Sequence, residues 1–368
     1  MNERTRHVGI FVSSLHTGGA EKVAITIANE FARSGLLVDL IVMKSGGELK
    51  SQISSKVCLI ELETNRGRSS FFSLLSYIRS SRPEAVLSFL TVPNALLGLT
   101  KIVLRSKSPR LVGSERSYMT DINVRGGRNL FNYTLYVVIT RVGYRLLDAN
   151  VALTTGIYDR MKTQRLVKPS KIVVLPNPID LARIVLRQNS KVDSHGRIEL
   201  LAVGRLDELK DYPTMIRAVQ RLRETHDAHL TILGDGAKRS ELQLLINEMK
   251  LSNYVTLFGN VSDTSSWYSK AHLLVLSSKV EGFPNVIVEA MAHGVPVVST
   301  DCMTGPKDIL RGTEFGELVP VGDFRALANA VLILIDRELD SKFLRSRAED
   351  FDSKKVCKLY ERLLLDIT

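Results

Sequence analysis

Cysteine is scarce in this 368-residue chain, and its three cysteines lie far apart. Cys58, Cys302 and Cys357 are odd in number, and none belongs to a CxxC pair. This spacing argues against a disulfide framework and against a cysteine-based zinc site. The composition therefore fits a protein of the reducing cytoplasm.

Long apolar runs are also lacking. The longest uncharged run, residues 85–100, contains Pro93 and Asn94 and is shorter than the roughly 20 residues that span a bilayer. The N-terminal sequence MNERTRHVGIFVSS has no apolar stretch long enough for a signal peptide. We therefore predict a chain that does not cross a membrane, which leaves open that it lies on one. Its length favours about two domains.

Several catalytic motifs are missing. No GxGxxG follows the first apolar run, so the standard nicotinamide fingerprint is absent, as are GxxxxGK[ST], HExxH and GxSxG. Asp350 and Asp352 have the spacing of a metal-binding DxD motif. They lie in a charged C-terminal stretch away from any expected strand end, so we predict that they belong to a helix surface. No metal site is predicted.

Negative charge is scarce in the first half of the chain only. The formal net charge is +11. Residues 1–176 contain 25 Lys and Arg against 12 Asp and Glu, whereas residues 177–368 contain 25 against 27. A localised positive field suggests nucleic acid, an anionic membrane surface or a polyanionic substrate as partner. The alternative is a solvated basic surface without a partner.

Short apolar runs alternate with runs of helical period along almost the whole chain. The expected strands cover residues 8–13, 38–43, 57–62, 85–89, 111–114, 150–153 and 171–175, then 199–203, 229–233, 255–258, 273–276 and 295–300. This alternation predicts two α/β domains with parallel sheets. The polar stretch 188–196 is the best candidate for a linker. We expect domains over 1–176 and 177–350, with a C-terminal helix over 351–368.

Glycines follow two of the expected strands. Gly18 and Gly19 lie between the first strand and the first helix, and Gly234-Asp235-Gly236 follows the strand at 229–233. Glycine allows close approach of a ligand to the backbone, and a helix N-terminus attracts anions. A tight turn without a ligand explains both loops almost as well. Both loops do follow the carboxyl ends of strands, where open α/β sheets bind ligands.

The most informative segment runs from Glu281 to Glu289. Pro284 suits a first helical turn, Gly294 a C-terminal cap and Pro296 the residues beyond it. We therefore expect Glu281 in the loop that enters a short helix and Glu289 on the helix, with both carboxylates near its N-terminus. This end of a helix receives phosphates. Because carboxylates repel phosphates, we expect the two glutamates to bind hydroxyl groups on either side of a diphosphate.

The run EGFPNVIVEAMAHGVPVVST, residues 281–300, closely resembles the donor-binding signature of family 4 retaining glycosyltransferases, which have the two-domain GT-B fold. Further segments are similar to family motifs in the same order, so that the resemblance spans nearly the full length. They are the glycine loop at 18–21, the strand-end pair Arg205 and Lys210, and the nucleotide loops at 234–236 and 258–259. The resemblance implies two Rossmann-like domains that face each other across a cleft, with the C-terminal helix returning to the first domain.

The resemblance also implies roles for individual residues. Arg205 and Lys210 would neutralise the leaving diphosphate, an electrostatic contribution that is usually large. Glu281 would bind hydroxyls of the transferred sugar and Glu289 those of the ribose. The residues implied in donor binding are Gly18, Gly19, Gly204, Gly234, Asp235, Gly259, Phe283, Pro284, Asn285, Val286 and Glu289. Surface ion pairs with Asp207 or Asp211 are the alternative for the two basic residues.

Two departures from the family pattern concern the acceptor and the phosphates. Many relatives carry a histidine in the first domain, whereas Glu115 and Arg116 occupy the strand end here. Arg116 is then a candidate for binding an anionic acceptor, and a salt bridge with Glu115 or a neighbour is the alternative. Asp211 stands where relatives frequently have small or amide residues. The segment 301–306 resembles a subgroup that extends lipid-linked or surface polysaccharides, including N-acetylhexosamine transferases.

These features together predict a retaining, metal-independent glycosyltransferase. It would move a sugar such as an N-acetylhexosamine from a UDP-sugar to a hydroxyl of a lipid-linked or growing glycan. No cofactor is expected, and the protein is expected to lie on the inner face of the cell membrane through its basic half. The alternatives are a nucleotide-sugar epimerase or sugar phosphorylase of the same fold, or a basic nucleic-acid-binding protein. A nucleic-acid-binding protein would not need Glu281 and Glu289.

Overall fold

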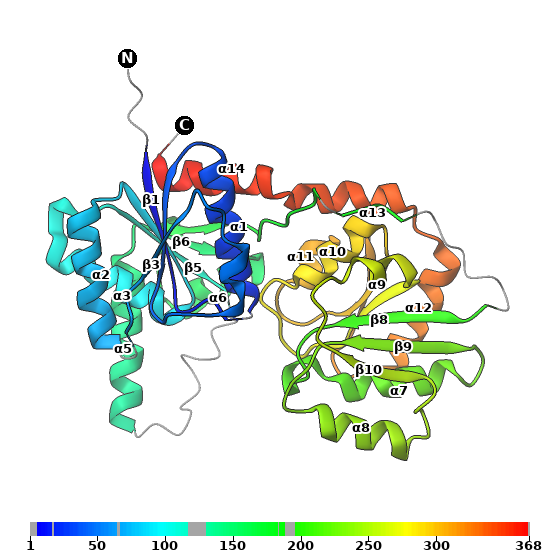
Figure 1. Ribbon diagram of the computed structural model, residues 1–368. Coiled ribbons are helices and arrows are strands. Elements are labelled where there is room, and N and C mark those ends of the chain that lie inside the picture. Colours follow the sequence, from blue (N-terminus) through cyan, green and yellow to red (C-terminus); the bar gives the residue numbers. More distant parts are fainter. Residues whose placement is uncertain are drawn as a thin grey trace. The chain divides into compact units, whose positions relative to one another are not determined.

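The computed structural model contains two compact units (Figure 1). The first unit combines Met1–Ile179 with Asp352–Thr368, and the second is Asp180–Phe351. The structure describes residues 6–16, 18–64, 67–116, 130–182, 184–187 and 196–366. Most of the candidate linker at 188–196 therefore lies outside the described residues. Among the described helices, none has both the length and the apolar character needed to cross a bilayer.

The first unit is built on a seven-stranded sheet in which the described strands pair in parallel. The strand order is β3-β2-β1-β4-β5-β6-β7. The strands are β1 (His7–Val12), β2 (Leu37–Val42), β3 (Cys58–Glu61), β4 (Ala85–Phe89), β5 (Arg110–Glu115), β6 (Ala149–Ala152) and β7 (Ile172–Val174). The order reverses direction between β1 and β4, which makes this a doubly wound sheet.

Helices cover both faces of this sheet because alternate strand side chains point to opposite faces. Ile10 and Leu40 pack with α1 and α14, whereas Phe11 and Ile41 pack with α2 and α3. The described α-helices of the unit are α1 (Gly19–Arg33), α2 (Gly67–Ser81), α3 (Thr91–Leu104), α5 (Leu130–Leu146), α6 (Thr155–Thr163) and α14 (Ser353–Leu365). The strands are accordingly apolar on both sides, as parallel sheets require.

The C-terminal helix α14 belongs to the core of the first unit (Figure 1). Val356, Tyr360 and Leu364 are buried in the same cluster as the apolar face of α1. Asp352 begins this helix, since its side chain accepts a hydrogen bond from the backbone N–H of Lys354. The C-terminal segment thus completes a core that begins at the other end of the sequence.

The Asp350 and Asp352 pair is placed differently from our prediction of a single helix surface. Asp350 lies in a 3-10 turn and forms ion pairs with Arg347 at 2.7 Å and with Arg311 at 3.4 Å. Asp352 caps the next helix. Both aspartates therefore have structural partners at the junction of two helices. Within the described ranges, no three His, Cys, Asp or Glu side chains gather in a way that could hold a metal ion.

The second unit is built on a six-stranded sheet with the order β10-β9-β8-β11-β12-β13 and parallel pairings. Its strands are β8 (Ile198–Val203), β9 (Ala228–Leu233), β10 (Val255–Gly259), β11 (Leu273–Leu276), β12 (Val297–Thr300) and β13 (Gly316–Val319). Its helices are α7 (Tyr212–Leu222), α8 (Arg239–Glu248), α9 (Ser265–Lys270), α10 (Asn285–His293), α11 (Pro306–Leu310), α12 (Phe324–Arg337) and α13 (Ser341–Ala348). The prediction of two parallel-sheet α/β domains is confirmed.

Two partly or fully buried histidines make the stability of the second unit depend on pH. His272 accepts a hydrogen bond from the N–H of Glu199 at 2.9 Å, and His293 stacks on Tyr268 with ring centroids 4.9 Å apart. Burial is the main cause that lowers the pKa of both rings below the ordinary value of 6.5. A histidine with a lowered folded pKa stabilises the fold above its unfolded pKa. This contribution is lost as the pH falls, because the unfolded chain takes up the proton first.

We therefore expect the thermal unfolding midpoint of the second unit to decrease when the pH is lowered from about 7.5 to about 5.5. Differential scanning calorimetry at both pH values measures the decrease. A His272→Asn/His293→Gln variant should show a smaller decrease, whereas a variant of the exposed His226, His226→Gln, should behave as the parent. An equal decrease in the parent and the double variant would contradict the assignment to these two rings.

Candidate active site

The strand order of the second unit reverses between β8 and β11. β8 ends at Val203 and continues into Gly204, and β11 ends at Leu276 and continues into Ser277. Open α/β sheets bind ligands beyond the carboxyl ends of the strands at such a point. Arg205, Lys210 and Glu281 all follow these two strand ends. The sheet therefore brings together residues that are about 75 positions apart in the sequence.

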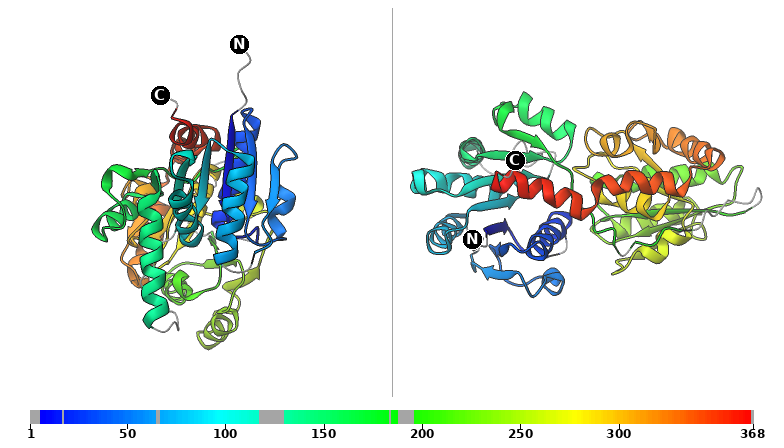
Figure 2. Two further views of the ribbon diagram at one scale, coloured as in Figure 1. Left: turned by 90° about the vertical axis from the view of Figure 1, so that its left-hand side faces the viewer. Right: turned by 90° about the horizontal axis from the view of Figure 1, so that it is seen from above.

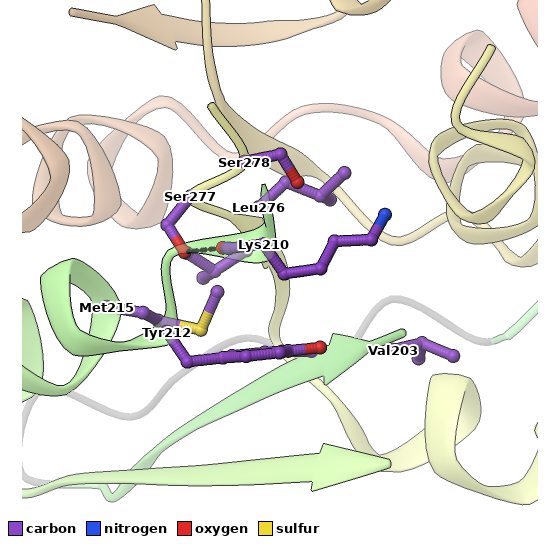
Figure 3. Close-up of a pocket in the computed structure, with 9 residues that line it drawn as sticks. Val203, Lys210, Tyr212, Met215, Leu276, Ser277 and Ser278 are labelled. Atoms are coloured by element: carbon purple, nitrogen blue, oxygen red, sulfur yellow. Dashed lines mark hydrogen bonds between the residues drawn. The ribbon is translucent and has the colours of Figure 1, made fainter. Parts of the chain in front are cut away.

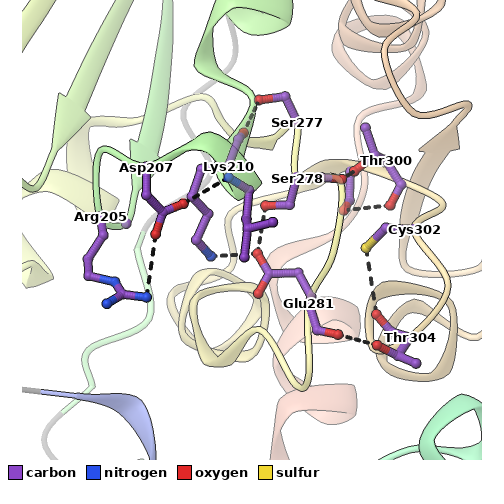
Figure 4. A network of polar contacts seen from close by, with 12 residues as sticks. Arg205, Asp207, Lys210, Ser277, Ser278, Glu281, Thr300, Cys302 and Thr304 are labelled. Atoms are coloured by element: carbon purple, nitrogen blue, oxygen red, sulfur yellow. Dashed lines mark hydrogen bonds and ion pairs between the residues drawn. The ribbon is translucent and has the colours of Figure 1, made fainter. Parts of the chain in front are cut away.

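Lys210 and Glu281 form an ion pair at this edge (Figure 4). The distance between Lys210 Nζ and Glu281 Oε1 is 2.6 Å, and the hydroxyl of Ser278 donates to the same oxygen at 2.6 Å. The side chains are 24% and 9% exposed, respectively. Because the pair is mostly removed from water, loss of one partner would leave a poorly solvated charge on the other.

Hydrogen bonds to the backbone fix the loops that carry this pair (Figure 4). The hydroxyl of Ser277 donates to the carbonyl of Lys210 at 2.8 Å, and that of Thr300 donates to the carbonyl of Ser278 at 2.6 Å. The hydroxyl of Thr304 donates to the carbonyl of Glu281. The ends of β11 and β12 therefore hold the Glu281 loop in place.

Cys302 lies beside this network and is buried. Burial, followed by the nearby Glu281 carboxylate, raises the pKa of its thiol to about 11. The thiol is therefore protonated at neutral pH, and its sulfur donates weakly to the carbonyl of Thr304 at 3.6 Å. Since the thiolate is the nucleophile, this cysteine is a packing residue.

A small recess opens between the ends of β8 and β11 (Figure 3). Its empty volume is about 210 Å³. The lining is apolar at Met215 and polar at Lys210, Tyr212 and Ser278. The hydroxyl of Tyr212 donates to the carbonyl of Gly204 at 3.0 Å, and burial raises the pKa of this tyrosine, which keeps the hydroxyl neutral. The enclosed part of the recess has room for little more than a water molecule.

Arg205 is much more exposed than Lys210. Its side chain is 81% exposed, and Nη2 lies 3.4 Å from the carboxylate of Asp207. The surface ion pair considered as an alternative thus exists for Arg205, and such pairs contribute little to stability. For Lys210 the alternative is wrong, because Asp211 accepts a hydrogen bond from Thr214 at 2.7 Å while Lys210 pairs with Glu281.

The glycines of the second unit allow three strand ends to touch. A Cβ atom on Gly234, whose φ is +137°, would lie 2.0 Å from the carbonyl oxygen of Gly204. The N–H of Gly234 donates to the carbonyl of Gly259 at 2.7 Å. Asp235 is exposed, and its carboxylate accepts from the N–H of Gly236 at 2.7 Å. Close backbone packing therefore requires glycine at 234, whatever else this loop binds.

The predicted short helix before Gly294 is confirmed as α10, which follows Pro284 and ends at a left-handed Gly294 with φ of +78°. Glu289 on this helix accepts a hydrogen bond from the hydroxyl of Tyr268 at 3.1 Å. The two glutamates of the motif therefore have different partners. Phe283 is buried and its ring lies 5.5 Å from that of Phe351, so this side chain packs in the core.

Gly18 and Gly19 precede and begin α1 in the first unit. Gly18 has an extended backbone that any residue adopts, and a Cβ atom there would meet only the flexible side chain of Glu21. A Cβ atom on Gly19 would have no neighbour within 4 Å. Local packing does not require either glycine, so a tight turn does not explain the pair.

Glu115 and Arg116 at the end of β5 are buried, with 1% and 8% exposure. Glu115 accepts a hydrogen bond from the hydroxyl of Tyr144, and Arg116 donates to Asn177. The guanidinium of Arg116 also lies 4.3 Å from the ring centroid of Phe89. Burial is the main cause that lowers its pKa. The backbone N–H of Arg116 also donates to Glu115 at 3.0 Å, so both residues take part in a buried polar network of the first unit.

Three residues of the site were not predicted from the sequence: Ser278, Thr304 and Tyr268. Each contacts one of the two glutamates, through a side-chain oxygen or through the backbone carbonyl of Glu281. The only sequence signal was that Ser277 and Ser278 follow the expected strand at 273–276, where site residues concentrate.

Comparison with known proteins agrees with this arrangement. A family model for glycosyl transferases group 1 matches residues 197–337, and one for glycosyltransferase family 4 matches residues 17–183. Two relatives come from Campylobacter jejuni subsp. jejuni serotype O:2. The first is N-acetylgalactosamine-N,N'-diacetylbacillosaminyl-diphospho-undecaprenol 4-alpha-N-acetylgalactosaminyltransferase, which is 28% identical over 95% of this chain and 97% of the relative.

The second relative is GalNAc-alpha-(1->4)-GalNAc-alpha-(1->3)-diNAcBac-PP-undecaprenol alpha-1,4-N-acetyl-D-galactosaminyltransferase, which is 26% identical over 98% of both chains. Among solved structures, Anabaena Alr3699/HepE in complex with UDP superimposes with a TM-score of 0.77. The match covers 98% of this chain and 100% of that chain at 17% identity. A glycosyltransferase family model thus matches each unit, group 1 on the second and family 4 on the first, and the chain has the GT-B fold.

Proposed function

We propose that this glycosyltransferase moves a sugar from a UDP-sugar to a hydroxyl of a lipid-linked glycan, with retention at the anomeric carbon. The observation that carries the proposal is the Lys210–Glu281 pair at the β8–β11 switch point. In this proposal Lys210 is the cation for a leaving phosphate and Glu281 the carboxylate for sugar hydroxyls, and the 2.6 Å contact between them supports a shared site. The C. jejuni relatives, which transfer N-acetylgalactosamine to diphospho-undecaprenol-linked saccharides, support an N-acetylhexosamine donor.

Charge on the departing UDP is the main problem that the enzyme solves. As the glycosidic bond breaks, negative charge accumulates on the β-phosphate, and preorganised cations stabilise this charge. Lys210 is held in place by Glu281, whereas the exposed Arg205 is free to turn from Asp207 towards the diphosphate. The N-terminus of α10 adds partial positive charge at the same edge of the sheet.

The remaining site residues orient the donor. Oε1 of Glu281 accepts hydrogen bonds from Lys210 and Ser278. We assign the other carboxylate oxygen, Oε2, to a hydroxyl of the transferred sugar. Glu289 binds the ribose hydroxyls, with Tyr268 orienting its carboxylate. In this proposal Gly18 and Gly19 let the backbone of the first unit approach the donor closely. We assign no protein nucleophile, and phosphate neutralisation by side chains makes a metal ion unnecessary.

The acceptor assignment also sets the location that we propose. A glycan attached to a polyprenyl diphosphate remains at a membrane surface, so the enzyme would act as a peripheral protein on the cytoplasmic face. The excess of basic residues within 1–176 is consistent with an anionic lipid surface or a diphosphate acceptor.

A donor panel tests this function directly. Radiolabelled UDP-N-acetylgalactosamine, UDP-N-acetylglucosamine and UDP-glucose are each incubated with the enzyme and a polyprenyl-diphosphate saccharide, in the presence of EDTA. We expect label in the lipid fraction with one of the N-acetylhexosamine donors, and an α-linkage by NMR. Isomerised donor or sugar phosphate without labelled lipid would overturn the transferase proposal. Loss of transfer in EDTA would overturn the metal-independent mechanism.

A further inference from the structure

Helix α5 of the first unit carries its large apolar side chains on the solvent side as well as on the buried side. Leu135, Val138, Ile139 and Val142 are 47%, 51%, 38% and 38% exposed. Their spacing of three and four residues places them on one face of the helix. The opposite face is buried through Thr140, Gly143, Tyr144 and Leu147. This is the reverse of an ordinary surface helix, whose outer face is polar.

The neighbouring helix α3 extends this apolar surface. α3 and α5 pack side by side, since a Cβ atom on Gly98 would lie 1.9 Å from the carbonyl oxygen of Gly143. Val92, Ile102 and Val103 of α3 are 42% to 56% exposed. Figure 2 shows α5 along the outer side of the first unit in its left-hand view. We call the exposed residues of α5 and α3 the outer apolar face.

The described helices of this region carry basic side chains and no acidic ones. The sequences of α2, α3 and α5 contain no Asp or Glu, and they contain five Lys and Arg. Arg141 and Arg145 lie on the exposed side of α5, and Arg105 and Lys107 are exposed directly after α3. Asp148, which follows α5, is paired with Lys101. The face therefore combines apolar groups with uncompensated positive charge.

Exposed apolar residues of the second unit have a different setting. Leu244 and Ile333 are 62% and 51% exposed, and each is the one large exposed apolar residue of its helix. The helix of Leu244 also contains Glu241 and Glu248, and that of Ile333 contains Asp336. Single exposed apolar side chains are ordinary on soluble proteins, whereas a continuous stripe marks an interaction surface.

The charge distribution decides between two kinds of partner. A second copy of this chain packed face to face would bring the arginines of two α5 helices together, which is unfavourable. At an anionic phospholipid surface, Arg141 and Arg145 can instead bind lipid phosphates. The apolar stripe can then contact the boundary between headgroups and acyl chains. Amphipathic helices bind membrane interfaces through this combination.

We propose that the outer apolar face is the membrane-docking surface of the enzyme and that it takes anionic phospholipids. The stripe Leu135–Val138–Ile139–Val142 inserts into the boundary between headgroups and acyl chains, while Arg141 and Arg145 bind lipid phosphates. This inference deepens the proposed function, because it rests on an acceptor that is held at a membrane.

Vesicle flotation of the full chain tests the proposal. The vesicles contain phosphatidylcholine alone or equal parts of phosphatidylcholine and phosphatidylglycerol. We expect the parent to bind the anionic vesicles, and Leu135→Ser/Val138→Ser/Val142→Ser to weaken this binding about tenfold or more. Arg141→Gln/Arg145→Gln should weaken it roughly 30-fold on anionic vesicles and hardly at all on neutral ones. The control Leu244→Ser/Ile333→Ser should bind as the parent does.

A second readout separates this inference from the proposed function. Transfer to a water-soluble acceptor analogue should be unchanged in all three variants, because none of these residues belongs to the donor site. Unchanged vesicle binding in both α5 variants would overturn the docking surface even if transfer is found. A parent dimer that the triple serine variant converts to monomers, without loss of vesicle binding, would overturn it in favour of self-association.

Discussion

Replacement of Glu281 with glutamine should lower kcat for sugar transfer by about two orders of magnitude while leaving the fold intact. The amide keeps the shape of the side chain but removes the charge that holds Lys210 Nζ at 2.6 Å. Lys210 then lacks its partner in a mostly buried setting, and the sugar hydroxyl loses a charged acceptor. Steady-state kinetics against donor concentration measure kcat, and a thermal unfolding scan shows whether the fold is intact.

Two further variants make this result specific. Glu317→Gln removes the same charge from an ion pair of the same unit, Arg337 with Glu317 at 3.2 Å, and should leave kcat unchanged. In a double-mutant cycle, Lys210→Met/Glu281→Gln shows whether Glu281 acts only by holding Lys210. A double variant as active as Lys210→Met alone would remove the sugar contact from the proposal, and near-normal kcat in Glu281→Gln would remove Glu281 from the site.

Substitution of Gly98 with alanine should destabilise the first unit by about 3 kcal/mol. The new Cβ atom would lie 1.9 Å from the carbonyl oxygen of Gly143, so α3 and α5 would have to separate. The direction of this change is informative. Without the clash, alanine in a helix interior would stabilise the fold by about 1 kcal/mol relative to glycine. For a unit of this size we expect the unfolding midpoint to decrease by roughly 6–12 °C.

Hydrogen exchange of α3 and α5 shows whether the loss is local to this contact. Gly19→Ala is the control, since a Cβ atom there has no neighbour within 4 Å, and its midpoint should not decrease. A higher midpoint in Gly98→Ala would mean that the two helices are not packed backbone to backbone. The apolar stripe of α5 would then lack the rigid support that the docking proposal assumes.

Features that depend on neighbours in sequence were predictable. Pro284 and Gly294 mark the two ends of α10: Pro284 is the N-cap residue, one position before the predicted first turn, and Gly294 is the left-handed cap. The apolar runs predicted both parallel sheets for the same reason, except for the edge strand β13, which no expected strand covered. The motif with Glu281 was also recognisable, since several residues of defined type occur within one short segment.

Features that depend on distant partners were not predictable. Glu115 and Arg116 lie at a strand end, where polar residues serve either a ligand or the core, and the sequence does not say which. Their partners Tyr144 and Asn177 are 29 and 61 residues away, and only the fold brings them together. Tyr268 was missed for the same reason, because its partner Glu289 is 21 residues away.

The position of α14 has a consequence for how the protein is made. Ribosomal synthesis delivers the sheet of the first unit early, but α14, which buries the apolar side of α1 through Val356 and Tyr360, follows the whole second unit. Until then that face of the nascent domain stays open to water and to chaperones, whereas the second unit, continuous from 180 to 351, has all its elements. The second unit can therefore mature first, and the first unit becomes complete only after α14 has left the ribosome.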